Sequence, residues 1–142
     1  MNSDPNRTQP HLPADTVLVV EDEVLVRVVI SEYLRRCGYK VIEAVSADEA
    51  ILVLQKADLR VDVVFSDIEM SGSMDGFGLS RWVHDNRPEL QIILTGTVAR
   101  AADAAADLCE EGPTLAKPYE PQLVVDHIKR LLAARGRVVR ED

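Results

Sequence analysis

The hydrophobic positions of this chain follow two alternating patterns. Short runs of β-branched and aliphatic residues, apolar at consecutive positions, predict strands that are covered on both faces. Longer stretches with apolar residues three and four positions apart predict amphipathic helices. The predicted strands are residues 16–20, 40–44, 61–66, 91–95 and 114–117, and the predicted helices are residues 23–37, 47–57, 77–87, 100–109 and 121–134.

Turn and capping residues separate these elements. Gly38 stands where the first helix needs a C-terminal cap, and the segment from Ser46 to Glu49 has the spacing of a capping box. Pro88 closes the third helix, because a proline cannot continue the helical hydrogen bonding. The stretch 67–76 after the third strand is rich in turn-forming residues, which predicts a loop.

Five strands that alternate with five helices predict an α/β fold. We expect a doubly wound, five-stranded parallel sheet of the flavodoxin-like (β/α)5 type, with right-handed crossovers and the strand order 2-1-3-4-5. This order places the switch point between the first and third strands. One domain is expected over residues 16–135, flanked by flexible tails at 1–15 and 136–142.

Composition narrows the classes of partner. The net charge of −8 over 142 residues opposes nonspecific binding to nucleic acid or anionic membrane. No segment resembles a signal peptide or has the length of a membrane span, so we expect a cytoplasmic protein, and the length predicts no separate output module. Cys37 and Cys109 lack metal-ligand or CxxC spacing, and we predict two separate packing thiols.

Polar residues follow four of the predicted strands at the point where each strand ends. They are Glu21 and Asp22, then Asp67, Thr95 and Lys117. Because the carboxyl ends of parallel strands share one edge, we expect these side chains to gather in one pocket. Taken singly, each has an ordinary interpretation as a helix cap, a turn residue, a strand residue or a solvated lysine.

Together, the same residues predict a site for phosphate chemistry. Three converging carboxylates repel one another and need a cation. Oxygen ligands without nearby histidine or cysteine favour Mg²⁺ or Mn²⁺, and Mg²⁺ keeps waters that substrate oxygens can replace. An ammonium from Lys117 and a hydroxyl from Thr95 would hold phosphoryl oxygens opposite the metal.

Four motifs carry a family resemblance. They are Val19-Val20-Glu21-Asp22-Glu23, Ser66-Asp67-Ile68-Glu69-Met70 with Met74-Asp75-Gly76, Leu94-Thr95-Gly96 and Lys117-Pro118-Tyr119. In this order and on these strand ends, they resemble the receiver domains of two-component response regulators over residues 16–134.

The resemblance implies a role for each pocket residue. Asp67 would accept a phosphoryl group from a sensor histidine kinase or a histidine phosphotransfer protein. Asp22 and Asp67 would bind Mg²⁺ directly together with the backbone carbonyl of Glu69, and Glu21 would act mainly through water. Thr95 and Lys117 would bind the phosphoryl oxygens. Phosphorylation would then shift the surface formed by the fourth helix, fifth strand and fifth helix, and that surface would serve a downstream target or a phosphorylation-dependent homodimer.

The chain departs from the family pattern at a few positions. Thr114 stands where Tyr or Phe is common, Ser71 stands where Pro is common, and the loop at 72–74 is one residue longer. Tyr119 has two interpretations, a part in signalling or simple packing. The side chain of Glu69 likewise either contacts an attacking water or is a solvated loop acid.

Three other classes of protein share part of this pattern. A small aspartyl-phosphate hydrolase needs a second Asp two residues after its nucleophile, where this chain has Glu69. A flavodoxin-like electron carrier needs a hydroxyl- and glycine-rich loop after the first strand, whereas Glu21-Asp22-Glu23 would repel a flavin phosphate. A receiver-like interaction module that works without phosphate would not need all five pocket residues.

Overall fold

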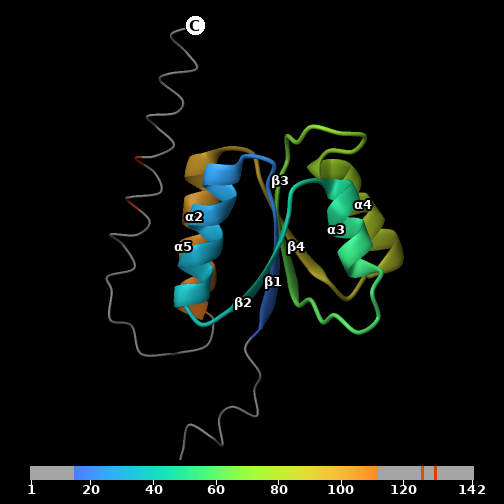
Figure 1. Ribbon diagram of the computed structural model, residues 1–142, viewed down its shortest axis with the longest axis horizontal. Coiled ribbons are helices and arrows are strands. Elements are labelled where there is room, and N and C mark those ends of the chain that lie inside the picture. Colours follow the sequence, from blue (N-terminus) through green and yellow to red (C-terminus); the bar gives the residue numbers. More distant parts are fainter. Residues whose placement is uncertain (1–14, 112–125, 127–129, 131–142) are drawn as a thin grey trace, which may run out of the picture.

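The computed structural model describes residues 15–111 together with residues 126 and 130. In this part of the chain, strands in the order β2-β1-β3-β4 form one parallel sheet, and helices cover both of its faces (Figure 1). The elements are β1 (Thr16–Val20), α2 (Val24–Arg36), β2 (Lys40–Ala44), α3 (Ala47–Leu54), β3 (Val63–Asp67), α4 (Gly76–Asn86), β4 (Gln91–Thr95) and α5 (Val98–Glu111). The α/β class and the first four positions of the predicted strand order are therefore confirmed.

The sheet core explains the apolar runs. All five residues of β1 are buried, because β1 lies between β2 and β3 and is covered on both faces. Val17 and Val19 face the core beside α2 and α5, whereas Leu18 and Val20 face the core beside α3 and α4. Successive strand residues point to opposite faces, so a doubly covered strand must be apolar at every position.

Local chemistry sets the ends of the helices. The Ser46 hydroxyl caps α3 by accepting a hydrogen bond from the backbone N–H of Glu49 at 3.1 Å. The Asp75 carboxylate caps α4 in the same way, accepting from the N–H of Gly78 at 2.9 Å. Gly38, just after α2, has a φ of 104°, a conformation that glycine adopts without strain. The predicted caps at Ser46 and Gly38 are confirmed.

The helix after β4 occupies an unexpected position. A right-handed connection from β4 to a parallel strand on its outer edge would place this helix on the face of α3 and α4. The structure instead packs α5 beside α2 on the opposite face (Figure 1). Small residues allow this close packing, since Ala101, Ala102 and Ala105 are buried in the same core cluster as α2. The predicted fifth strand at 114–117 and the last helix at 121–134 lie outside the described residues, apart from two isolated positions.

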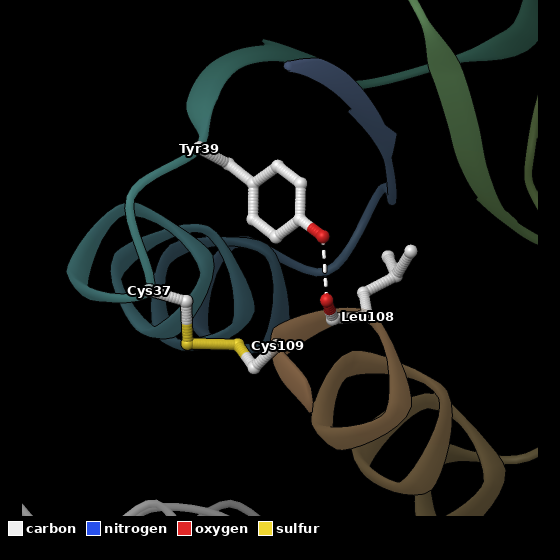
Figure 2. The surroundings of a disulfide bond; sticks show 4 residues. All are labelled: Cys37, Tyr39, Leu108 and Cys109. Carbon is white, nitrogen blue, oxygen red and sulfur yellow. Dashed lines mark hydrogen bonds between the residues drawn. A yellow bond between two sulfur atoms is a disulfide. The ribbon is translucent and has the colours of Figure 1, made fainter. Parts of the chain in front are cut away.

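The same packing joins the two cysteines. Cys37 follows the end of α2, Cys109 lies in the last turns of α5, and a disulfide links them across a Cα–Cα distance of 5.5 Å (Figure 2). Beside it, the Tyr39 hydroxyl donates a hydrogen bond to the carbonyl of Leu108. The prediction of two separate thiols is therefore wrong, although both residues do lie in the core. The error arose because sequence spacing carries no information about residues 72 positions apart.

None of the helices in the part of the chain that the structure describes is long and apolar enough to cross a membrane.

Candidate functional site

Three carboxylates meet at the carboxyl ends of two neighbouring strands. Glu21 and Asp22 directly follow β1, Asp67 is the last residue of β3, and these strands pair in parallel. One oxygen from each of the three carboxylates lies within 4.8 Å of the others. The side chains line a cleft with a volume of about 280 Å³. The predicted proximity of these three acids is thus confirmed.

A hydroxyl-bearing strand end forms another wall of the cleft. Thr95 ends β4, pairs with Asp67 in the sheet register and is only 5% exposed. Gly96 and Thr97 follow it along the wall, and Val98 and Ala101 at the start of α5 continue it. Lys117, the fifth predicted pocket residue, lies outside the described residues.

Backbone hydrogen bonds hold the acids in place. The N–H of Glu23 donates to Oε2 of Glu21 at 3.1 Å, and Nη1 of Arg27 donates to the backbone carbonyl of Glu21 at 3.0 Å. The N–H of Glu69 donates to Oδ1 of Asp67 at 3.3 Å. These contacts orient two of the carboxylates from the backbone that follows each strand.

A glycine lies directly beneath the loop that carries Asp67. The N–H of Gly76 donates to the carbonyl of Ile68 at 2.7 Å, so the start of α4 packs against the end of β3. A Cβ at position 76 would contact the carbonyl oxygen of Asp67 and come within 2.7 Å of the Ile68 Cα. Sequence reasoning placed Gly76 in a motif but missed this close approach, which only the folded backbone reveals.

The pKa values of the three acids are shifted by their burial and by their proximity to one another. The pKa of Glu21 is raised from 4.5 to about 7, mainly by burial and also by the charges of Asp67 and Asp22. The hydrogen bond from the Glu23 N–H lowers the pKa and offsets part of this rise. Burial also raises the pKa of Asp67. Burial acts in the same direction on Asp22, but hydrogen bonds from Ser71, from the Glu21 side chain and from its own backbone together outweigh it, and the pKa of Asp22 is lowered.

This donor set fits a hard divalent cation. The three clustered acids offer only oxygen, and no lysine or arginine is among the described residues that line the cleft. Mg²⁺ takes oxygen ligands and keeps several waters, which suits a site with a few carboxylates and an open side. Glu69 also lines the cleft.

The raised pKa of Glu21 predicts a pH-dependent stability of the metal-free chain. Glu21 keeps its proton in the folded state up to about pH 7 but loses it near pH 4.5 when unfolded. Below pH 4.5, Glu21 is protonated in both states and the free energy of unfolding is highest. This free energy then falls as the pH rises through 7, by about 2 kcal/mol after allowance for solvent screening. We expect urea unfolding in EDTA to show this loss mainly between about pH 4.5 and 7.

The matched variant for this prediction is Glu21→Gln, which cannot ionise. The difference in unfolding free energy between wild type and variant should change with pH over the same range. If the two proteins gave parallel curves, ionisation of Glu21 would not be the cause.

Comparisons with known proteins agree with this geometry. The sequence profile of the family described as "Response regulator receiver domain" matches residues 17–129. The chain therefore belongs to the response regulator receiver domain family, the signalling domains of two-component systems. Domains of this family receive a phosphoryl group from histidine kinases or phosphotransfer proteins and bind Mg²⁺ at an acidic pocket.

Individual relatives differ in how much of their length the chain spans. The transcriptional regulatory protein ResD of Bacillus subtilis is 30% identical over 116 residues, which cover 82% of this chain and 47% of ResD. The response regulator receiver protein CpdR of Brucella abortus is 29% identical over 119 residues, which cover 83% of this chain and 97% of CpdR. The chain thus spans about half of ResD and nearly all of CpdR.

Solved structures support the receiver fold. The chemotaxis protein CheY4 of Vibrio cholerae superposes with a TM-score of 0.54 and 28% identity, covering 84% of this chain and 99% of CheY4. The flavodoxin-like receiver fold is therefore shown for this chain, with four of the five predicted strands in the described residues.

Proposed function

We propose that this chain is a phospho-accepting switch in which Asp67 takes a phosphoryl group from a histidine kinase or phosphotransfer protein in the presence of Mg²⁺. The observation that carries the proposal is the convergence of three carboxylates within 4.8 Å, beside the strand end that carries Thr95. A phosphate-transfer site needs this combination of metal ligands, nucleophile and hydroxyl donor.

The three acids have two roles in the proposed function, binding of the metal ion and attack on phosphorus. Asp22 and Asp67 would hold Mg²⁺ together with the backbone carbonyl of Glu69, and Glu21 would act mainly through water. When bound, the ion offsets negative charge between the carboxylates and the incoming phosphoryl group. Ionised Asp67 is the form that attacks, so the site must counteract the burial that raises its pKa.

The backbone contact of Asp67 supports a division of work between its two oxygens. Oδ1 accepts the hydrogen bond from the Glu69 N–H, and our proposal takes Oδ2 as the attacking oxygen. A bond forms between Oδ2 and phosphorus while the phosphorus–nitrogen bond of the donor phosphohistidine breaks. The imidazole leaves with the bonding electron pair, and Thr95 and Lys117 hold the phosphoryl oxygens.

The switch acts through Thr95 and the residues that follow it. Phosphorylation adds a charge of about −1.5 to −2 beside β4, which favours movement of the Thr95 hydroxyl toward the phosphoryl group. Thr95 connects through Gly96 and Thr97 to α5, whose first turn lines the same cleft. Within the described residues, α5 is therefore the element we expect to respond. Thr114 and Tyr119, which bear on the rest of the signalling surface, lie outside the described residues.

Labelling with a small phosphodonor tests the proposed function. The full chain is incubated with Mg²⁺ and an acyl phosphate, and intact mass is followed with time. We expect at most one phosphoryl group per chain, and no labelling in EDTA. Turnover of many equivalents of a phosphomonoester would instead favour the hydrolase, and an absence of both activities would favour a module that works without phosphate.

A further inference from the structure

The loop after β3 is tied to the acidic pocket by one residue. The backbone N–H of Ser71 donates to Oδ2 of Asp22 at 3.1 Å, and the Ser71 hydroxyl donates to the same oxygen at 3.2 Å. The two residues are 49 positions apart in the chain. One oxygen of Asp22, which follows β1, therefore accepts two hydrogen bonds from the loop that follows β3.

The two bonds to Oδ2 fix the orientation of the Asp22 carboxylate. Asp22, held in this way, is one of the three carboxylates that each have an oxygen within 4.8 Å of the others. A partly exposed aspartate would otherwise exchange between rotamers, and binding an ion would have to restrict that motion. Two hydrogen bonds restrict it before the ion arrives.

The contact depends on the residue at position 71. A chain with proline there, the residue that the family resemblance leads one to expect, would lack both the backbone N–H and the hydroxyl. Neither hydrogen bond to Asp22 would exist in such a chain. The next residue, Gly72, has a φ of 109°, so the loop turns immediately after the contact in a conformation that favours glycine.

A second serine anchors the same loop elsewhere. The Ser73 hydroxyl donates to both carboxylate oxygens of Asp48 at 2.8 and 3.2 Å, and Asp48 lies in α3 rather than in the acidic cluster. The loop therefore carries two comparable serine–aspartate contacts, of which only one reaches the pocket. This pair separates an effect on the pocket from a general effect on loop order.

We propose that Ser71 is a positioning residue that holds Asp22 ready to bind Mg²⁺. The inference rests on the proposed function, because it assigns the ion to this cluster. Ser71 acts through Asp22, so it should govern the affinity for the ion rather than the attack of Asp67 on phosphorus.

A graded series of variants tests this role in the full chain. Ser71→Thr keeps both donors, Ser71→Ala keeps only the N–H, and Ser71→Pro keeps neither. By titration calorimetry with Mg²⁺ alone, we expect Thr to match wild type, Ala to weaken binding about three- to tenfold, and Pro to weaken it further. Ser73→Ala is the control and should bind Mg²⁺ as wild type does.

A second measurement separates positioning from chemistry. At saturating Mg²⁺, the labelling rate of Ser71→Ala should approach that of wild type, while the Mg²⁺ concentration for half-maximal rate rises. Unfolding midpoints show whether each variant is folded, and Ser71→Ala carries the test if Ser71→Pro does not fold.

Three outcomes would overturn the proposal. Equal Mg²⁺ affinity in wild type and Ser71→Ala would remove Ser71 from the site while leaving the proposed function intact. Equal weakening in Ser71→Ala and Ser73→Ala would reduce the contact to general loop anchoring. A wild-type chain that binds no Mg²⁺ would contradict the proposed function itself, and the inference would fail with it.

Discussion

Substitution of Asp67 by asparagine is expected to abolish phosphoryl labelling while leaving the fold intact. Asparagine has nearly the same shape, and its amide oxygen can still accept the hydrogen bond from the Glu69 N–H. The variant lacks the ionised oxygen that must attack phosphorus. Removal of one acid from the cluster of three also relieves repulsion, so stability should be unchanged or higher.

The measurement is intact-mass labelling with Mg²⁺ and an acyl phosphate, accompanied by urea unfolding of each protein. The matched control is Asp75→Asn, which changes an acid in the same loop but keeps a side chain that caps α4 well. We expect full labelling in the control and none in Asp67→Asn. Continued labelling of Asp67→Asn at the wild-type rate would exclude Asp67 as the acceptor.

Replacement of Gly76 by alanine is expected to cause the largest loss of stability around the pocket. A Cβ at this position would meet the backbone of Asp67 and Ile68, which cannot rotate away as a side chain can. Either α4 or the end of β3 must move. We expect a loss of about 2–3 kcal/mol in the free energy of unfolding.

A second glycine in the same helix provides the control. A Cβ at Gly78 would approach the Met74 side chain, which is flexible, and alanine favours helix over glycine by about 1 kcal/mol. Gly78→Ala should therefore lie within about 1 kcal/mol of wild type in urea unfolding. Equal unfolding free energies for the two variants would show that the packing of Gly76 on the Asp67 backbone is not the cause.

Gly76→Ala should also weaken the chemistry of the site. A Cβ at position 76 would push against the carbonyl of Asp67 and the backbone that leads to Glu69. Under conditions in which the variant is folded, we expect slower labelling than in Gly78→Ala. This comparison connects the tight backbone packing to the placement of the proposed nucleophile.

The sequence by itself determined the strands and the residues at their ends. An apolar run buried on both faces stops where a polar residue begins, so Asp22, Asp67 and Thr95 were identifiable as strand-end residues. Parallel pairing then required these ends to share one edge of the sheet. Local signals were also sufficient for the helix ends, because the caps at Ser46 and Gly38 depend on residues only a few positions away.

Only the tertiary structure decided which distant residues meet. The packing of α5 beside α2 brought Cys37 and Cys109 together, and the fold of the loop after β3 brought Ser71 to Asp22. No periodicity or spacing encodes such pairs, since each depends on how whole elements pack across the sheet. The hydrophobic pattern therefore determined at which strand ends the acids of this receiver domain lie. Tertiary packing decided which distant residues contact those acids and the elements around them.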